Sequence, residues 1–248
     1  TMMPSSLRGP VSAMTLKSIS DFHLGGREEQ LSSIQATIAR MYRIDAPTNL
    51  LESQAGKVFQ TVDILRALSA VEYTPANGAV YPDSDFGMAL RQVAQLIKAG
   101  IGLEIACIDI GGWDTHEYQG SVEGEMAGLL GNLGQGMAAF YTDLRDYMGN
   151  VTVVSMSEFG RRVDENASQG TDHGHGNVMF VMGGGSTGQM YADWPTLAPE
   201  ALDDGDLEIT TDYRDVLSEI LIKRLGNTAI DQIFPGYTPN LRGIIADR

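Results

Sequence analysis

Short apolar runs alternating with a long helical stretch are the feature that most limits how this chain can fold. The segment 103–110 is rich in isoleucine and is followed by two glycines, a pattern typical of a buried parallel strand. A helical pattern over about 122–148 leads into a second apolar run at 151–156, and a third run covers 177–182. Strand–helix–strand order predicts α/β architecture, with functional residues beyond the carboxyl ends of the strands.

Four further segments show the apolar spacing of three or four residues that predicts helices. They cover about 27–44, 49–71, 85–99 and 213–225. Candidate N-cap residues stand before the last two of them: Ser84 or Asp85, and Thr211 or Asp212. Residues 1–26 contain prolines and glycines, so we expect a loop there with room for one short strand. The early helices are expected to pack on a face of the sheet.

Composition limits the classes of protein to which the chain can belong. The chain has 248 residues, of which 43% are hydrophobic. We therefore expect residues 1–248 to form one domain with a substantial core. A net charge of -15 would repel a phosphate backbone, which argues against a nucleic-acid partner and fits carboxylates that hold cations. No run approaches the ~18 apolar residues of a membrane-spanning helix. The single cysteine, Cys107, excludes an internal disulfide and is expected to be buried in its apolar run.

Three of the four histidines, His116, His173 and His175, lie within three residues of a carboxylate in the middle of the chain. Neutral imidazole nitrogen together with anionic oxygen is the ligand set of hard or borderline divalent metals. The rest of the sequence is therefore interpreted as the scaffold that brings these side chains together.

Asp109, Asp114 and His116 form the first candidate group of metal ligands. The strand expected at 103–110 would place Asp109 at the sheet edge, and the glycines at 111–112 would let the chain turn back beside it. Alternate residues of an extended loop point the same way, so Asp114 and His116 can share one ion. The alternative is that Asp109 serves as a capping residue and that the rest is an ordinary turn.

Asp172, His173 and His175 form the second candidate group. Two histidines two residues apart, next to an aspartate and between glycines, are expected on a loop rather than in a helix. Glycines let a backbone approach a ligand closely, which suits a metal site. The alternative is a polar loop that is simply exposed to solvent.

The segment Ser157–Arg162, which follows the run at 151–156, is the third motif with chemical potential. Glu158 is a candidate metal ligand, hydrogen-bond partner of a histidine or general base. Arg161 has the planar donor fork that suits phosphate or sulfate. The alternative is a surface salt bridge between Glu158 and Arg161 or Arg162, which would contribute little to stability.

Six stretches together resemble the bacterial family catalogued as domain of unknown function 1501. They are DIGGWDTH at 109–116, SEFGR at 157–161, GTDHGHG at 170–176, the glycines 183–184, DWP at 193–195 and TDYR at 211–214. That family is grouped with the alkaline phosphatase and sulfatase superfamily. The resemblance implies an alkaline phosphatase-like, three-layer α/β/α sandwich with a mostly parallel central sheet. It also implies one or two divalent metals (Zn, Ca, Mg or Mn) at the carboxyl edge, and a periplasmic or extracellular location.

The resemblance also implies roles for the candidate residues. Asp114 and His116 resemble one Asp-x-His ligand pair, and the residues at 172, 173 and 175 resemble the second ligand group. Glu158 stands where the superfamily has an acid at a strand end, and Asp109 is a further candidate ligand. The chain resembles the later part of a typical member, because the opening strand that carries the nucleophile has no counterpart before residue 103.

The sequence leads to three hypotheses of function. The first is a metal-dependent hydrolase of small-molecule or polysaccharide phosphate or sulfate esters, in which two ions ~3.5–4 Å apart clamp the reacting oxygens. Arg161 would stabilise charge on the transferred group, and Glu158 would act as ligand or base. The second is a non-catalytic exported binding or surface protein that keeps a structural cation on the same loops. The third is an interaction module that uses the long helices.

Overall fold

The computed structural model describes residues 13–19 and 28–247 of the chain. The described residues divide into two compact units, each with its own internal contacts. One unit holds the chain up to Ala76 together with Val80–Ile108, and the other holds Asn77–Ala79 together with the chain from Asp109. Most of the loop and short strand expected within 1–26 lies outside the described residues. Within the described ranges, no helix combines the length and hydrophobicity needed to cross a lipid bilayer.

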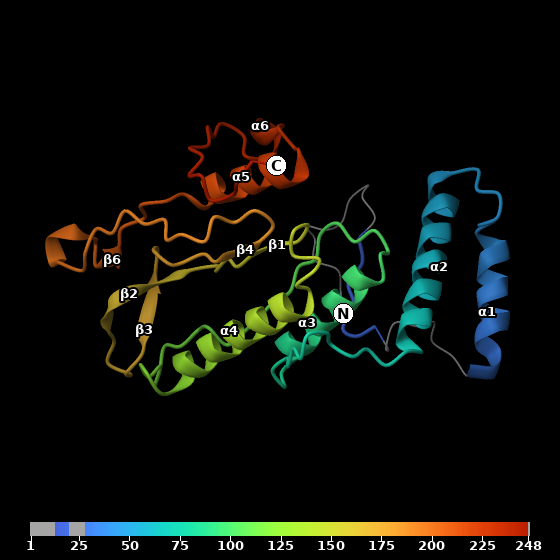
Figure 1. The fold of residues 1–248 in the computed structure, drawn as a ribbon, viewed down its shortest axis with the longest axis horizontal. Helices are drawn as coiled ribbons and strands as arrows, with labels where there is room; N and C mark the ends of the chain where they lie inside the picture. The colour runs from blue at the N-terminus through green and yellow to red at the C-terminus, as the bar shows by residue number, and fades with distance from the viewer. Residues whose placement is uncertain (1–12, 20–27, 248) are drawn as a thin grey trace. The chain divides into compact units, whose positions relative to one another are not determined.

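The first unit is helical, as the apolar spacing predicted. It contains α1 (Glu28–Met41), α2 (Leu50–Ser69) and α3 (Asp85–Lys98). The first two helices run side by side as a helical hairpin (Figure 1), and the amide of Gln35 on α1 donates to Asp63 Oδ1 on α2 at 3.0 Å.

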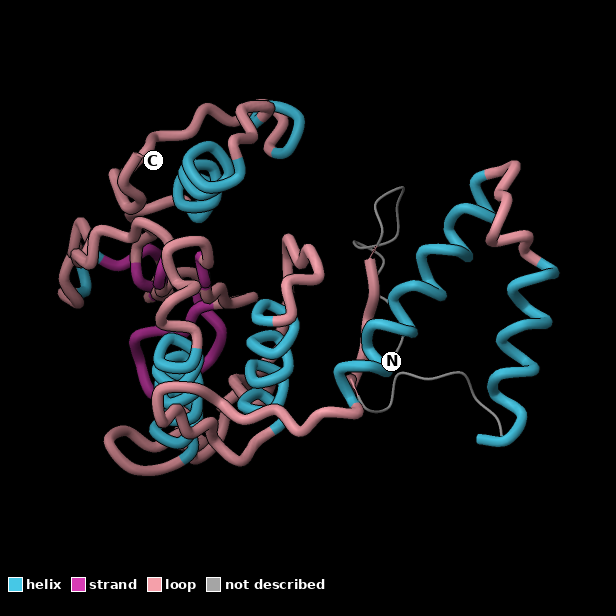
Figure 2. The backbone as a smooth tube through the Cα atoms, turned by 45° about the vertical axis from the view of Figure 1, so that its right-hand side comes forward, coloured by secondary structure: helices cyan, strands magenta, loops and turns pink. Residues whose placement is uncertain are grey.

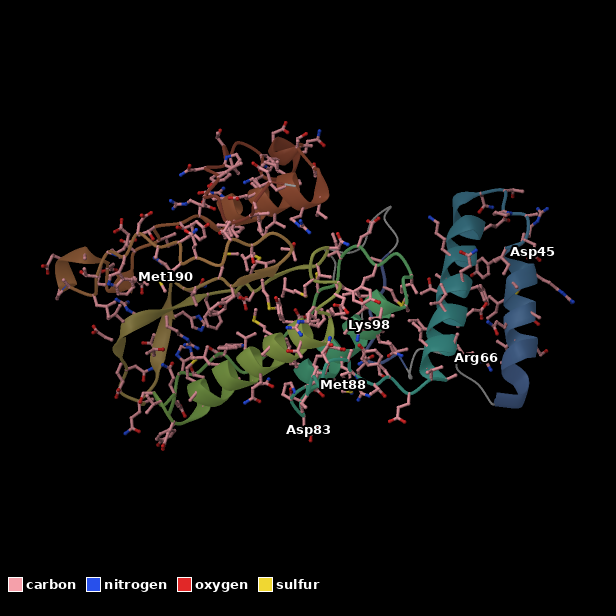
Figure 3. All side chains as sticks on the ribbon, viewed as in Figure 1. Asp45, Arg66, Asp83, Met88, Lys98 and Met190 are labelled. Carbon is pink, nitrogen blue, oxygen red and sulfur yellow. The ribbon has the colours of Figure 1, made fainter. Side chains whose placement is uncertain are left out.

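Side chains at the starts of α2 and α3 explain where these helices begin. The side chain of Asn49 accepts from the N–H of Glu52, and the side chain of Ser84 accepts from the N–H of Gly87. Both caps satisfy backbone donors that have no partner inside the helix. Figure 3 labels Met88, in the first turn of α3, and Lys98, its last residue. The expected cap at Ser84 is therefore confirmed.

The apolar run at 103–110 does not form a strand, contrary to the prediction. Ile105 is 69% exposed, and Cys107, expected to be buried, is exposed as well. Isoleucine-rich composition indicates β propensity, but it does not supply a neighbouring strand with which to pair. The segment instead has no regular secondary structure, and the division of the chain between the two units falls within it, after Ile108.

Strands occur among the described residues only between positions 152 and 207, in the second unit (Figure 2). The helix α4 (Glu125–Asp143) precedes them, as predicted. β1 (Thr152–Val154) pairs with β4 (Val181–Gly183) in a two-stranded antiparallel sheet, with Val153 opposite Met182. Both strands lie in or beside the apolar runs that predicted them, but they are antiparallel neighbours.

A four-stranded sheet with the order β3-β2-β6-β5 lies between β1 and α5 in the sequence. Its strands are β2 (Gly160–Glu165), β3 (Thr171–Gly174), β5 (Leu202–Asp203) and β6 (Asp206–Leu207). Every pairing in it is antiparallel. The predicted three-layer α/β/α sandwich with a mostly parallel central sheet is therefore wrong. Parallel neighbours need a crossover connection, usually a helix, and the chain between β1 and β4 forms a hairpin instead.

The helix α5 (Tyr213–Leu225) has the bounds that the sequence predicted, with Asp212 as its N-cap. It is preceded by a short 3-10 helix, η2 (Pro199–Ala201), and followed by α6 (Ile230–Ile233). Val216 on α5 packs with Ile244 and Ile245 of the C-terminal segment, and the partly buried Val181 of β4 joins this cluster. The C-terminal segment is thus part of the core of the second unit.

The carboxylate of Glu219, on the buried face of α5, accepts four hydrogen bonds and has no exposed surface. Its Oε1 accepts from Lys223 Nζ at 3.2 Å and from the N–H of Ile245 at 2.9 Å. Its Oε2 accepts from the N–H groups of Arg242 and Gly243, both at 2.9 Å. Burial alone would raise the pKa of Glu219, but the bonds from Ile245 and Lys223 hold the pKa below its ordinary value.

Replacing Glu219 by Gln should reduce the free energy of unfolding by roughly 2–4 kcal/mol, because the amide leaves buried N–H donors without an acceptor. Equilibrium unfolding in urea measures the loss, with the exposed Glu208→Gln as control. The wild-type contribution is complete above the unfolded-state pKa of about 4.3 and is lost as pH falls through the lower native pKa. The variant should lack this loss of stability in acid. Superimposable wild-type and Glu219→Gln curves at neutral pH would contradict this role.

Candidate metal centre

The hairpin of β2 and β3 supports one side of the candidate site. Arg161 on β2 lies opposite His173 on β3, and the register shifts before Glu165 pairs with Thr171. Such a bulge changes the direction of side chains along the strand. The sequence had placed His173 on a loop, and the structure places it on a strand.

The loop that carries Asp114 and His116 lies against the turn of this hairpin. Glu117 forms an isolated antiparallel bridge with Gln169, and the N–H of Tyr118 donates to the carbonyl of Ser168 at 3.0 Å. A Cβ atom on Gly170 would lie 2.2 Å from the backbone carbonyl of His116. Only glycine permits this approach, so Gly170 fixes how closely the loop docks on the hairpin.

Gln119 joins the loop to β3 through its side-chain oxygen. Its Oε1 accepts from the hydroxyl of Thr115 at 2.7 Å and from the hydroxyl of Thr171 at 2.8 Å. Thr115 is 2% exposed, so this link lies in the interior, between the two histidine-bearing segments. The backbone on both sides of the site is therefore held by buried polar contacts.

Asp114, His116 and His173 bring three potential ligand atoms within 4.8 Å of one another. Asp114 Oδ1 lies 2.7 Å from His173 Nε2 and 3.0 Å from His116 Nε2. The ring centroids of the two histidines are 4.8 Å apart. Asp114 is 64% exposed, and the two imidazoles are 40% and 49% exposed, so solvent reaches the group. Residues that the sequence assigned to two separate groups thus meet in one cluster.

The pKa of Asp114 is held below its ordinary value, chiefly by the hydrogen bond from His173. Charges on His116, His173 and Arg161 act in the same direction, while partial desolvation opposes them. The carboxylate is therefore kept ionised, which is the form that binds a cation.

Asp172 lies on the other side of the His116 ring. Its Oδ1 is 3.1 Å from His116 Nδ1 and accepts from the side-chain amide of Asn166 at 3.1 Å. The pKa of Asp172 is lowered by the hydrogen bond from Asn166 and then by the bond with His116. Sequence reasoning missed Asn166, because its role depends on the hairpin turn. The only sequence signal is an asparagine four residues before a glycine in a polar stretch.

Arg161 and Phe159 contact the residues of the cluster and fix their positions. The guanidinium of Arg161 donates to the carbonyls of Thr171 (2.6 Å) and Trp113, and lies 3.4 Å from Asp114 Oδ1. Its side chain is 15% exposed, and its Nε is buried. Phe159 stacks on the His173 ring with centroids 4.0 Å apart. These contacts favour a positioning role for Arg161 over the anion-binding role suggested by the sequence.

The remaining predicted site residues lie outside this cluster. His175 faces Asp203 and Asp206 of the β5–β6 hairpin, at 3.8 and 3.5 Å. Glu158 is exposed and forms no hydrogen bond or ion pair with another described residue. Asp109 is exposed at the boundary of the second unit. Asp114, His116 and His173 are the only such metal-ligand group found among the described residues.

A comparison with protein families identifies the group to which the chain belongs. The family described as "Protein of unknown function (DUF1501)" matches residues 27–227. The chain is a member of this family. The matched range contains all three residues of the cluster as well as Asn166 and Asp172. No curated protein and no solved structure matches the chain.

Gly170→Ala should weaken both the fold and the cluster, because the new Cβ meets the His116 carbonyl. Overpacking of this kind costs about 1–3 kcal/mol of stability. Gly134→Ala is the matched control, since a Cβ at that exposed position in α4 meets nothing within 4 Å. Thermal denaturation compares the two variants. A Gly170→Ala melting temperature equal to that of Gly134→Ala would contradict the close docking of the loop.

Proposed function

We propose that Asp114, His116 and His173 bind one divalent metal ion and that the site catalyses hydrolysis. Ligands around a tetrahedral zinc ion lie roughly 3–3.5 Å from one another, because each is about 2.0–2.2 Å from the metal. The separations of 2.7 and 3.0 Å from Asp114 Oδ1 to the two Nε2 atoms fit this with small side-chain shifts. Two nitrogens and one carboxylate favour zinc or manganese over calcium or magnesium.

The position of His116 between two carboxylates is the observation that supports the proposal most strongly. Its Nδ1 faces Asp172 Oδ1 at 3.1 Å, and its Nε2 faces Asp114 Oδ1 at 3.0 Å. A neutral imidazole has one N–H and can donate to only one of these oxygens, whereas a protonated ring can donate to both. When the ring is neutral, a cation shared by Nε2 and Asp114 would remove the remaining repulsion between lone pairs.

Solvent access at the cluster supports a catalytic ion rather than a closed structural one. Structural zinc sites have four protein ligands, whereas catalytic sites combine three with an open position for water or substrate. Such an ion supplies Lewis-acid chemistry, polarising ester oxygens and lowering the pKa of water to about 7. Asp114 and the two histidines would hold the ion and leave a coordination position open to water or substrate. Glu158, the general base suggested by the sequence, lies outside the cluster, so the proposal assigns it no role at the ion.

Phosphate or sulfate esters are the proposed substrate class, on small molecules or polysaccharides. Support comes from the donor set. The grouping with alkaline phosphatases and sulfatases is itself part of the proposal, and the antiparallel sheets lend it no support. An exported, periplasmic or extracellular location forms part of the same proposal.

A non-catalytic protein with a structural cation is the second candidate. It is favoured by the origin of the ligands, because two lie on the loop at 114–116 and the third lies on β3. An ion bound by all three would cross-link two segments that are distant in the sequence. Metal-dependent turnover of aryl phosphates or aryl sulfates separates the candidates. One bound ion without turnover of either ester would leave the structural role.

His173→Ala should abolish stabilisation by zinc or manganese, because it removes one of three ligands. An ion at 100 times its Kd stabilises the wild type by about 2.7 kcal/mol, which thermal denaturation with and without metal detects. His175→Ala is the matched control, because His175 lies with Asp203 and Asp206 and should leave the metal-induced shift unchanged.

Two outcomes would reject the cation site. One is a metal-induced shift in His173→Ala as large as in the wild type. The other is loss of the shift in His175→Ala with His173→Ala unaffected, which would move the ion to the β5–β6 hairpin.

A further inference from the structure

Asn166 is held by hydrogen bonds at both ends of its side-chain amide. Its Oδ1 accepts from the N–H of Ser168 at 2.9 Å and from the N–H of Gly170 at 3.1 Å. Backbone N–H groups only donate, so these contacts require oxygen at that end of the amide. The nitrogen end must therefore face the acceptors, the carbonyl of His116 at 2.9 Å and Asp172 Oδ1 at 3.1 Å.

Asp172, which Asn166 holds in place, in turn fixes the position of the proton on the His116 ring. An ionised carboxylate only accepts, so the hydrogen bond of 3.1 Å between Asp172 Oδ1 and His116 Nδ1 forms only when Nδ1 carries the proton. Asp114 Oδ1 lies 3.0 Å from Nε2 and competes for that proton, but Asp172 is held in place by the amide of Asn166. In a neutral ring, Nε2 is then unprotonated and free to bind a metal. The carbonyl of His116 is held by the same Asn166 amide, so the backbone and the ring of His116 are positioned together.

Asp172 itself is badly placed to bind the ion. It faces Nδ1, and an ion shared with Asp114 lies at Nε2, on the other side of the ring. Asp172 also falls outside the group of ligand atoms that lie within 4.8 Å of one another. A carboxylate that orients a ligand histidine from its second nitrogen commonly fixes the tautomer and raises the basicity of the ligand.

We propose that Asn166 and Asp172 are positioning residues that keep the proton of His116 on Nδ1 and present Nε2 to the metal. The sequence had suggested Asp172 as a ligand, and this proposal gives it a different role. It rests on the cation site proposed for Asp114, His116 and His173. His173 is oriented differently, by stacking on Phe159.

Nitrogen-15 NMR of the metal-free chain tests the tautomer directly. Spectra are recorded at a pH of about 8, where imidazole is ordinarily neutral. Four histidines give few signals, and His116→Ala identifies the signal of interest. The proposal expects the proton on Nδ1 in the wild type and a shift towards Nε2 in Asp172→Asn. Asn166→Ala should move the signal in the same direction, and it serves as a second variant if Asp172→Asn folds poorly.

Zinc affinity is the second measurement, made by competition with a chelator. Both variants should still bind one zinc ion with affinity reduced 10–100-fold, the usual cost of removing an outer-shell partner. Asp164→Asn is the control, because it removes one negative charge from an exposed position on β2. It should retain wild-type affinity.

Three results would overturn the proposal. They are a wild-type His116 protonated on Nε2, an unchanged tautomer and affinity in both variants, or complete loss of zinc in Asp172→Asn, which would make Asp172 a ligand. A wild-type chain that takes up no zinc would reject the proposed function instead. The tautomer of the metal-free chain would then still decide whether Asn166 and Asp172 set the state of His116.

Discussion

A single carboxylate oxygen, Asp114 Oδ1, faces the Nε2 atoms of His116 and His173 and the guanidinium of Arg161. The groups come from segments roughly fifty residues apart in the chain, and only tertiary structure brings them together. A neutral imidazole offers each neighbour either a proton or a lone pair, so positive charge added beside Arg161 would stabilise this crowding. Protonation of the histidines or the proposed divalent ion would supply that charge, and the geometry around Asp114 thereby connects the fold to the proposed chemistry.

The scaffold reaches this geometry through backbone contacts rather than through the ends of parallel strands. The β2–β3 hairpin sets His173 opposite Arg161, and the guanidinium reaches both the Trp113 carbonyl and the Thr171 carbonyl. Gly170 allows the histidine-bearing loop to lie against the hairpin turn. A small antiparallel sheet can therefore assemble the same types of ligand that the sequence led us to expect at a parallel sheet edge.

The sequence predicted what depends on local chemistry and missed what depends on partners. The bounds of α5 were predicted because an aspartate cap, apolar spacing and a terminal glycine are all local signals. The run at 103–110 was misread because an apolar segment does not reveal whether a strand lies beside it. β2 and β3 were missed because their residues are mostly polar. Scarce histidines beside aspartates identified His116 and His173 as candidates. Asn166 was missed because its hydrogen bonds depend on the hairpin turn, which no sequence motif indicates.

Anomalous scattering at the zinc absorption edge, from a crystal grown with zinc, tests the central claim most directly. The account predicts one peak about 2.0–2.2 Å from His116 Nε2, His173 Nε2 and the carboxylate of Asp114. Asp172 should remain on the Nδ1 side of the His116 ring, outside the coordination shell. A fully occupied peak between His175 and Asp206, or a crystal with no peak at the Asp114 cluster, would contradict it.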